Sequence, residues 1–331
     1  MDSWIRNLPK AELHLHIEGT LESELMFELA KRNRVPLRFS SIDKVRKAYH
    51  FQNLQSFLDI YYEGTSVLVH EQDFYDLAMA YFIKASSQNV RHAEIFFDPQ
   101  THTERGISVK TMVSGISHAA QSAEKELGMS VFLIPCFLRH LSSEQAMQTL
   151  DELLPFKEKF VAVGLDSSEV GNPPTKFKNV FQKALQEGLL TVAHAGEEGP
   201  PEYIWQALEE LKVSRIDHGI RCLEDARLVK TLAMQKIGLT VCPLSNVKLK
   251  VFKKMERHNL KKLFEKELMV TINSDDPAYF GGYVNENYVA AIKALQFKKK
   301  EIIQLVKNSF LASFMDAEKK QRFIREVEEC M

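Results

Sequence analysis

Residues 189–195 read Leu-Leu-Thr-Val-Ala-His-Ala, an almost unbroken apolar run that ends beside the polar side chain of His194. Such a run is typical of a strand that is buried on both faces of a parallel sheet. Seven further short runs occur along the chain, and longer segments of helical periodicity separate them. They cover residues 11–16, 90–97, 130–136, 160–166, 215–219, 238–243 and 270–274. The sequence therefore predicts eight strands.

Eight strands that alternate with helices are the signature of an α/β fold, the closed (β/α)8 or TIM barrel. Helices are predicted over residues 22–33, with Thr20 as the N-cap, and over residues 110–127, because apolar side chains form one stripe in each. The alternative is an open doubly wound sheet. That sheet normally carries a Gly-x-Gly-x-x-Gly turn after its first strand, and this sequence has none.

The domain organisation follows from length and spacing. We expect one barrel domain over residues 1–331, because no linker or low-complexity segment divides the chain. The long stretch from 20 to 89, between the first two strands, holds several helical patterns and the aromatic segment 57–62. We interpret this stretch as a helical insertion that caps the mouth of the barrel. Extra helices are expected at the C-terminus.

The charge of the chain is nearly balanced, because 43 Lys and Arg residues against 44 Asp and Glu residues leave a formal net charge of -1. This balance gives no electrostatic footprint for nucleic acid, so a small-molecule partner is expected. The lysine clusters at 253–254, 261–262 and 298–300 are interpreted as solvated faces. No apolar run has the length of a signal peptide core or of a bilayer span. We therefore expect a cytoplasmic protein without a membrane partner.

The cysteines are widely spaced and form no Cys-x-x-Cys pair, which favours free, mostly buried thiols over a disulfide framework. They are Cys136, Cys222, Cys242 and Cys330. A zinc signature of the form His-x-Glu followed by Pro-Cys-x-x-Cys begins at His92 but fails, because its second cysteine is replaced by Arg139.

A second metal pattern is better supported. His14 and His16 close the first predicted strand, and two residues apart on a strand they project from the same face. Barrel enzymes carry their chemistry where strands end, so His194 and Asp275, at the ends of the fifth and eighth strands, are expected on the same rim. Three imidazoles and one carboxylate form a ligand set suited to zinc, although iron and manganese also accept such ligands.

Two further side chains on this rim are candidates for proton transfer. Glu197 lies three residues beyond His194, and burial that raises its pKa would make it a general acid. The alternative is a glutamate at the N-terminus of a helix near residues 200–201. His218 ends the sixth predicted strand, where it can orient or deprotonate water. The alternative for His218 is a structural histidine.

Asp276 follows Asp275 directly, and adjacent side chains on an extended chain point differently. One aspartate can therefore bind the metal while Asp276 faces a substrate. Two aspartates before Pro277 are also compatible with a simple turn.

Four motifs together resemble the adenosine/adenine deaminase family of the amidohydrolase superfamily, and the similarity runs from about Leu8 to the C-terminal helices. They are KAELHLHIEGTL (10–21), HAGE (194–197), RIDHGIR (215–221) and NSDDP (273–277). The resemblance implies one zinc ion per chain, bound by His14, His16, His194 and Asp275. It also implies a proton donor to the purine ring (Glu197), a group that assists the attacking water (His218), a hydrogen bond to purine N7 (Asp276) and a backbone contact to N3 (Gly164).

Two segments, FFDPQTHTERG (96–106) and VGLDSSEVGNPPTKF (163–177), resemble the adenine deaminase branch of this family. The nucleoside branch has an aspartate that contacts ribose where this chain has Glu18, whose longer side chain is expected to fill part of that space. The resemblance thus implies hydrolytic deamination of adenine to hypoxanthine and ammonia, a purine salvage reaction. The alternatives are deamination of adenosine, a non-catalytic purine-binding protein on the same scaffold, and a barrel hydrolase for another substrate.

Overall fold

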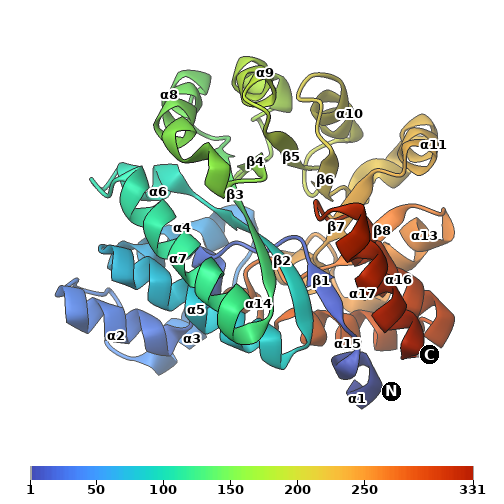
Figure 1. Ribbon diagram of the computed structural model, residues 1–331, viewed down its shortest axis with the longest axis horizontal. Helices are drawn as coiled ribbons and strands as arrows, with labels where there is room; N and C mark the ends of the chain where they lie inside the picture. Colours follow the sequence, from blue (N-terminus) through green and yellow to red (C-terminus); the bar gives the residue numbers. More distant parts are fainter. Residues whose placement is uncertain (1, 331) are drawn as a thin grey trace.

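The computed structural model describes residues 2–330 and contains one eight-stranded sheet with its strands in the order β1 to β8 (Figure 1). All neighbouring strands run parallel. The strands are β1 (Lys10–Glu12), β2 (Val90–Phe97), β3 (Ser130–Leu138), β4 (Ala162–Asp166), β5 (Leu190–Ala195), β6 (Arg215–His218), β7 (Gly238–Val241) and β8 (Met269–Ile272). The predicted (β/α)8 barrel is confirmed, and each predicted run overlaps one strand.

The barrel closes between its last and first strands through the residues that follow them. A parallel bridge joins Asp275, beyond β8, to Leu15, beyond β1. Its backbone hydrogen bonds run from the His16 N–H to the Asp275 carbonyl (3.0 Å) and from the Asp275 N–H to the His14 carbonyl (3.1 Å). Of the strand predicted over 11–16, only the first residues belong to β1. Beyond them, Leu15 and His16 form isolated β-bridges.

One long helix or helical segment follows each strand and packs on the outside of the barrel (Figure 1). These are α5 (Glu71–Ser87), α7 (Val109–Leu127), α8 (Ser143–Leu153), α9 (Lys178–Gln186), α10 (Pro201–Glu209), α11 (Ala226–Gln235), α13 (Leu260–Glu265) and α16 (Lys299–Leu311). Short helices open several loops, namely α6 (Pro99–Thr103), α12 (Pro243–Lys248) and α14 (Pro277–Phe280). The 3-10 turns are η1 (Glu18–Thr20), η2 (Thr65–Val67), η3 (Leu154–Lys159), η4 (Pro174–Phe177), η5 (Ile220–Glu224) and η6 (Met255–Arg257).

Both helices that were predicted by residue range are present, as α7 and as α2 (Ser23–Asn33). The side chain of Ser108 caps α7, and Gly128, with a φ of 64°, ends it in the left-handed conformation that glycine adopts without strain. The prediction that Thr20 caps α2 is wrong. Thr20 lies inside η1, where its hydroxyl donates to the Ile17 carbonyl (2.7 Å), and the N-cap position is taken by Glu22.

The insertion between β1 and β2 is shorter than the predicted stretch from 20 to 89. Helices α2, α3 (Ile42–Ala48) and α4 (Leu54–Gly64) form the cap. Helix α5 instead packs against α7 and β2 and so completes the first strand–helix repeat of the barrel. The physical reason is that a parallel pair needs a crossover helix on the outside of the sheet.

The two ends of the chain lie close together (Figure 1). The indole N–H of Trp4, in α1 (Asp2–Asn7), donates to the carbonyl of Cys330, just after α17 (Ala317–Glu329). Helix α15 (Val284–Leu295) packs on α1, and α16 packs on both β8 and β1. The predicted extra helices at the C-terminus are therefore present, and α16 covers the seam of the barrel.

All four cysteines are free, and only Cys330 is partly exposed, as predicted. Among the described residues, no helix has both the length and the apolar character needed to cross a membrane.

The interior of the barrel is filled by a small cluster of buried side chains from β2 to β5, namely Phe96, Ile134, Cys136, Ala162 and Val192. Gly164 lies among them in β4, paired with Cys136 of β3. A β-carbon added at Gly164 would lie 2.4 Å from the Cys136 sulfur, so the close packing of the two strands requires glycine here.

We predict that Gly164→Ala destabilises the protein by about 1–3 kcal/mol, the usual cost of overpacking a core. Adding Cys136→Ala should recover most of this loss, because it removes the sulfur that the new methyl group meets. Urea unfolding of the two single variants and the double variant measures the coupling. Additive effects would show that Gly164 is not required by packing against Cys136.

Candidate active site

A cavity of about 500 Å³ lies at the carboxyl ends of the strands, beneath the cap. Helix α4 covers it with Leu54, Phe57, Leu58, Tyr61 and Tyr62. The strand ends and the loops after them supply the polar lining, which comprises His16, Asp98, Asp166, Ser167, Glu169, His194, Glu197, His218, Asp275 and Asp276. The cap thus contributes an apolar and aromatic wall, and the barrel contributes the titratable groups.

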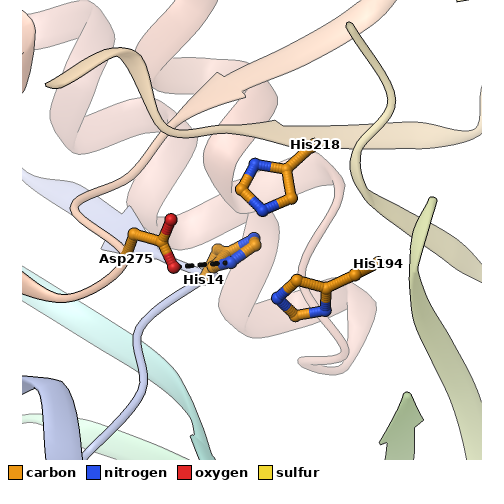
Figure 2. Close-up of side chains that lie close together, drawn as sticks. All are labelled: His14, His194, His218 and Asp275. Atoms are coloured by element: carbon orange, nitrogen blue, oxygen red, sulfur yellow. Dashed lines mark ion pairs between the residues drawn. The ribbon is translucent and has the colours of Figure 1, made fainter. Parts of the chain in front are cut away.

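The four predicted metal ligands come together at one point of this cavity. His14 Nε2 lies 3.2 Å and His16 Nε2 lies 3.5 Å from the same carboxylate oxygen of Asp275. His16 Nε2 is also 3.1 Å from His194 Nε2. Figure 2 shows the rings of His14, His194 and His218 around the Asp275 carboxylate.

These separations fit the coordination shell of one metal ion. Zinc lies about 2.0–2.2 Å from nitrogen and oxygen ligands, so two ligands of one ion stand about 3–3.5 Å apart. His14 Nε2 is buried and has no hydrogen-bond partner among the described residues, which an ion would supply. A group of four, His14, His194, His218 and Asp275, has ligand atoms within 4.8 Å of one another. The site can therefore hold a metal.

A hydrogen-bond chain orients the His14 ring for this role. The Thr240 hydroxyl donates its one proton to Asp217 (2.8 Å), so it accepts from Nδ1–H of His14 (2.9 Å). The lone pair of His14 is then on Nε2, the nitrogen that faces Asp275. Oδ2 of Asp217 also lies 3.7 Å from Nδ1 of His194, without a hydrogen bond between them.

Glu197 and His218 face each other, with His218 Nε2 3.5 Å from Glu197 Oε2. Burial, together with the negative charge of Asp275, raises the pKa of Glu197 well above its usual range. Burial lowers the pKa of His218 to about 3. Both shifts favour the uncharged form of the group, as a proton donor beside a base requires.

A second chain of hydrogen bonds, which sequence reasoning missed, determines how Glu197 is presented. The Leu260 N–H donates to Nδ1 of His258 (3.0 Å), so Nε2–H of His258 donates to Oδ1 of Asn246 (3.2 Å). The Asn246 amide then donates from Nδ2 to Oε1 of Glu197 (2.9 Å). Because Oε1 accepts this bond, the proton of a neutral Glu197 is placed on Oε2, which faces His218.

Two more positioning residues were missed. The Glu169 carboxylate accepts hydrogen bonds from four successive backbone N–H groups of the loop 196–199 that carries Glu197, at 2.6–3.0 Å. Arg139 is fully buried and donates to the carbonyl of His194 (2.7 Å). Glu169 lies in the segment 163–177 and Arg139 in the failed zinc signature, but the sequence assigned neither a role, because each acts through backbone groups of a distant loop.

The Asp275–Asp276 pair is not an extended segment. Asp275 has a φ of 65°, a left-handed conformation that is rare for residues other than glycine. Burial opposes ionisation of Asp275, but the positive character of His14 and His218 lowers its pKa. Burial and the neighbouring Asp275 raise the pKa of Asp276 well above its usual range. The turn thus presents to one cavity two carboxyl groups whose pKa values are shifted in opposite directions.

Gly164 and Glu18, which the sequence analysis placed near the substrate, are not among the described residues that line the cavity. Gly164 packs inside the barrel below Asp166. Its predicted role at purine N3 stays a prediction. Glu18 is also buried behind the lining, where it accepts hydrogen bonds from the Asp98 N–H (3.1 Å) and faces Nε2 of His102 (2.9 Å).

The residues that begin the failed zinc signature, His92 and Glu94, have a structural role. His92 Nε2 lies 3.1 Å from Glu94, and Glu94 forms a buried ion pair with Arg215. The ring of Phe314 covers this arginine at 4.7 Å. The group satisfies its own charges inside the barrel and does not contribute to the cavity lining given above.

The model of the adenosine deaminase family matches residues 9–330. The chain belongs to this family. It is 59% identical over 329 residues to an adenine deaminase of Hahella chejuensis, covering 99% of this chain and 98% of that protein. The crystal structure of an adenine deaminase from Arthrobacter aurescens is 48% identical, has a TM-score of 0.96, and covers 97% of this chain and 98% of that one. The chain is therefore a deaminase of the amidohydrolase type.

We predict that Asn246→Ala lowers kcat of this deaminase about 10- to 100-fold, the value of one hydrogen bond to a charged or acidic group. Bound metal should be unchanged, since Asn246 contacts Glu197 and His258. Steady-state kinetics and metal analysis test this. Unchanged kcat with intact metal would show that the amide does not position Glu197.

Proposed function

We propose that the protein is a zinc-dependent adenine deaminase that converts adenine and water into hypoxanthine and ammonia. The observation that carries the proposal is the meeting of four candidate metal ligands with Glu197, whose pKa is raised, and His218, whose pKa is lowered, in one cavity. The names of the relatives at 59% and 48% identity support adenine as the substrate.

His14, His16, His194 and Asp275 would hold one zinc ion per chain. The donor set of three imidazoles and a carboxylate is one that zinc accepts. When bound, the ion would supply Lewis acidity that lowers the pKa of water to about 7. The protein contributes the orientation of the His14 imidazole, through Thr240 and Asp217, and the backbone of the barrel seam positions the ligands that it carries.

The remaining residues move protons and orient the ring. Glu197 donates a proton to N1 of adenine, which makes C6 electrophilic. Water forms a new C6–O bond while His218 accepts its proton. The leaving amino group takes the proton that His218 accepted, and the C6–N bond breaks to release ammonia. The C6 hydroxyl proton returns to Glu197, which leaves hypoxanthine with a C6 carbonyl and a hydrogen on N1. Asp276 would hydrogen-bond N7 of the purine ring. The predicted contact of the Gly164 backbone with N3 would be the remaining contact to the ring.

The direct test is an ultraviolet assay, coupled to ammonia detection, of zinc-loaded protein against adenine and adenosine at equal enzyme concentration. We expect release of ammonia from adenine at a kcat/KM far above that for adenosine. A preference for adenosine would assign the nucleoside as the substrate. Binding of adenine without ammonia release would indicate a purine-binding protein on the same scaffold.

Glu197→Gln should lower kcat about 100- to 10,000-fold, the usual contribution of general acid–base catalysis, because the amide cannot donate a proton of suitable acidity. Zinc content should stay at one per chain, since Glu197 lies outside the proposed ligand set.

The pH profile provides the control. Only the protonated form of Glu197 can donate, so kcat/KM of the native enzyme should fall as pH rises through the raised pKa of this group. Near-native turnover of Glu197→Gln would contradict the role.

A further inference from the structure

Two carboxyl groups of the cavity have no part in the proposed proton transfers. Asp98 follows β2 and Asp166 ends β4, and both are buried in the wall of the cavity. Their carboxylate oxygens and a ring nitrogen of His16 lie within 4.8 Å of one another. Both residues lie at strand ends, like the predicted metal ligands. The expectation that barrel enzymes carry their chemistry at strand ends therefore applies to this pair as well.

Each carboxyl group has one oxygen with a neighbour and one without. The Tyr61 hydroxyl, from the cap, donates to Oδ2 of Asp98 (3.3 Å), and Oδ2 of Asp166 lies 3.5 Å from Nδ1 of His16. Oδ1 of Asp98 and Oδ1 of Asp166 are buried and accept no hydrogen bond from any amide, hydroxyl or ring N–H of the described residues. The two carboxyl groups hydrogen-bond each other, which takes one proton shared between them. A ligand N–H group would supply the further donor that this buried pair can accept.

A second cation is a poorer ligand for this pair than an N–H donor. If Nε2 of His16 binds the metal, its neutral ring must keep the proton on Nδ1. Nδ1 then donates towards Asp166 and is not available as a ligand. The pair therefore has acceptors for an N–H group and lacks the nitrogen that would complete a metal site.

The pair and Glu197 have different neighbours in the cavity. Asp98 is hydrogen-bonded to Tyr61 and Glu18, and Asp166 lies 3.5 Å from His16. Glu197 instead lies 3.5 Å from His218 and is hydrogen-bonded to Asn246. In adenine, N1 and the imidazole ring lie on opposite sides of the molecule. With N1 at Glu197 and N7 at Asp276, the N9–H group faces the Asp98 end.

We propose that Asp98 and Asp166 accept the N9–H hydrogen bond of the free purine base and so select the base over its nucleoside. This inference rests on the proposed function, because that function sets which end of the ring meets Glu197. A nucleoside has no hydrogen on N9, so it offers this buried pair no donor. Its sugar must also enter a region that Glu18 and Tyr61 already border.

The first measurement compares adenine with 9-methyladenine, which lacks only the N9 hydrogen. A site built around a substrate N–H group rejects an analogue without it by about 10,000- to 100,000-fold. We expect a kcat/KM ratio of that order for the native zinc-loaded enzyme. Calorimetric titration with hypoxanthine and 9-methylhypoxanthine, which release no ammonia, gives the same comparison without turnover.

The second measurement uses Asp98→Ala and Asp166→Ala, with the isosteric Asp98→Asn and Asp166→Asn to guard against misfolding. The alanine variants should lower kcat/KM for adenine about 10- to 100-fold, the value of a hydrogen bond to a charged group. They should lose little or nothing on 9-methyladenine, so the ratio of the two kcat/KM values should also fall about 10- to 100-fold. Asp73→Ala is the matched control, because Asp73 is a buried carboxylate of the first turn of α5, outside the cavity lining. Its ratio should equal the native one.

The outcomes separate this inference from the proposed function. If adenine is deaminated but both alanine variants keep the native ratio, or lose both substrates in parallel, the inference is overturned while the function stands. If no ammonia is released but hypoxanthine binds far better than its 9-methyl analogue and the variants abolish that difference, the function fails and the inference stands. Two metal ions per chain, with one lost in Asp166→Ala, would assign the pair to a cation and overturn the inference.

Discussion

The site depends on how the barrel closes. The bridge between Leu15 and Asp275 joins residues that are 260 positions apart, and its two backbone hydrogen bonds involve His14, His16 and Asp275. The interaction that completes the sheet is thus the one that brings three of the four candidate ligands to one point. Side chains on such a rigid element need little further ordering to bind an ion, which is the advantage of building a site on strands instead of loops.

Around this seam, hydrogen bonds to groups outside the cavity determine which atoms face it. Thr240 and Asp217 direct Nε2 of His14 inward, and Asn246 directs Oε2 of Glu197 inward. The Thr240 hydroxyl has one proton to donate, and the side-chain oxygen of Asn246 can only accept. These partners therefore determine which nitrogen of His14 and which oxygen of Glu197 carries a proton. Burial then strengthens the pattern, because in a medium of low dielectric the charged form of an isolated group is disfavoured.

The barrel, its eight strands and the meeting of the strand-end residues could be predicted from the sequence, because buried strands and their polar ends leave a local pattern. The boundary of the cap could not, since α5 has the same periodicity whether it covers the mouth or the sheet. Thr20 failed as a cap for a similar reason, because a 3-10 turn and a helix N-terminus share residue preferences. Glu169 and Asn246 left no pattern, since they act on a loop and a side chain that only the fold brings near.

Electrostatic interactions in the cavity couple the pKa values of its polar groups. Burial is the largest cause of the raised pKa of both Glu197 and Asp276, and the charge of Asp275 is the next. His14 and His218 in turn lower the pKa of Asp275. The carboxyl group that is a candidate metal ligand therefore also raises the pKa of two neighbouring acids. Moving or neutralising Asp275 would weaken metal binding and the proton donor together, so the two functions of the rim are coupled through one charge.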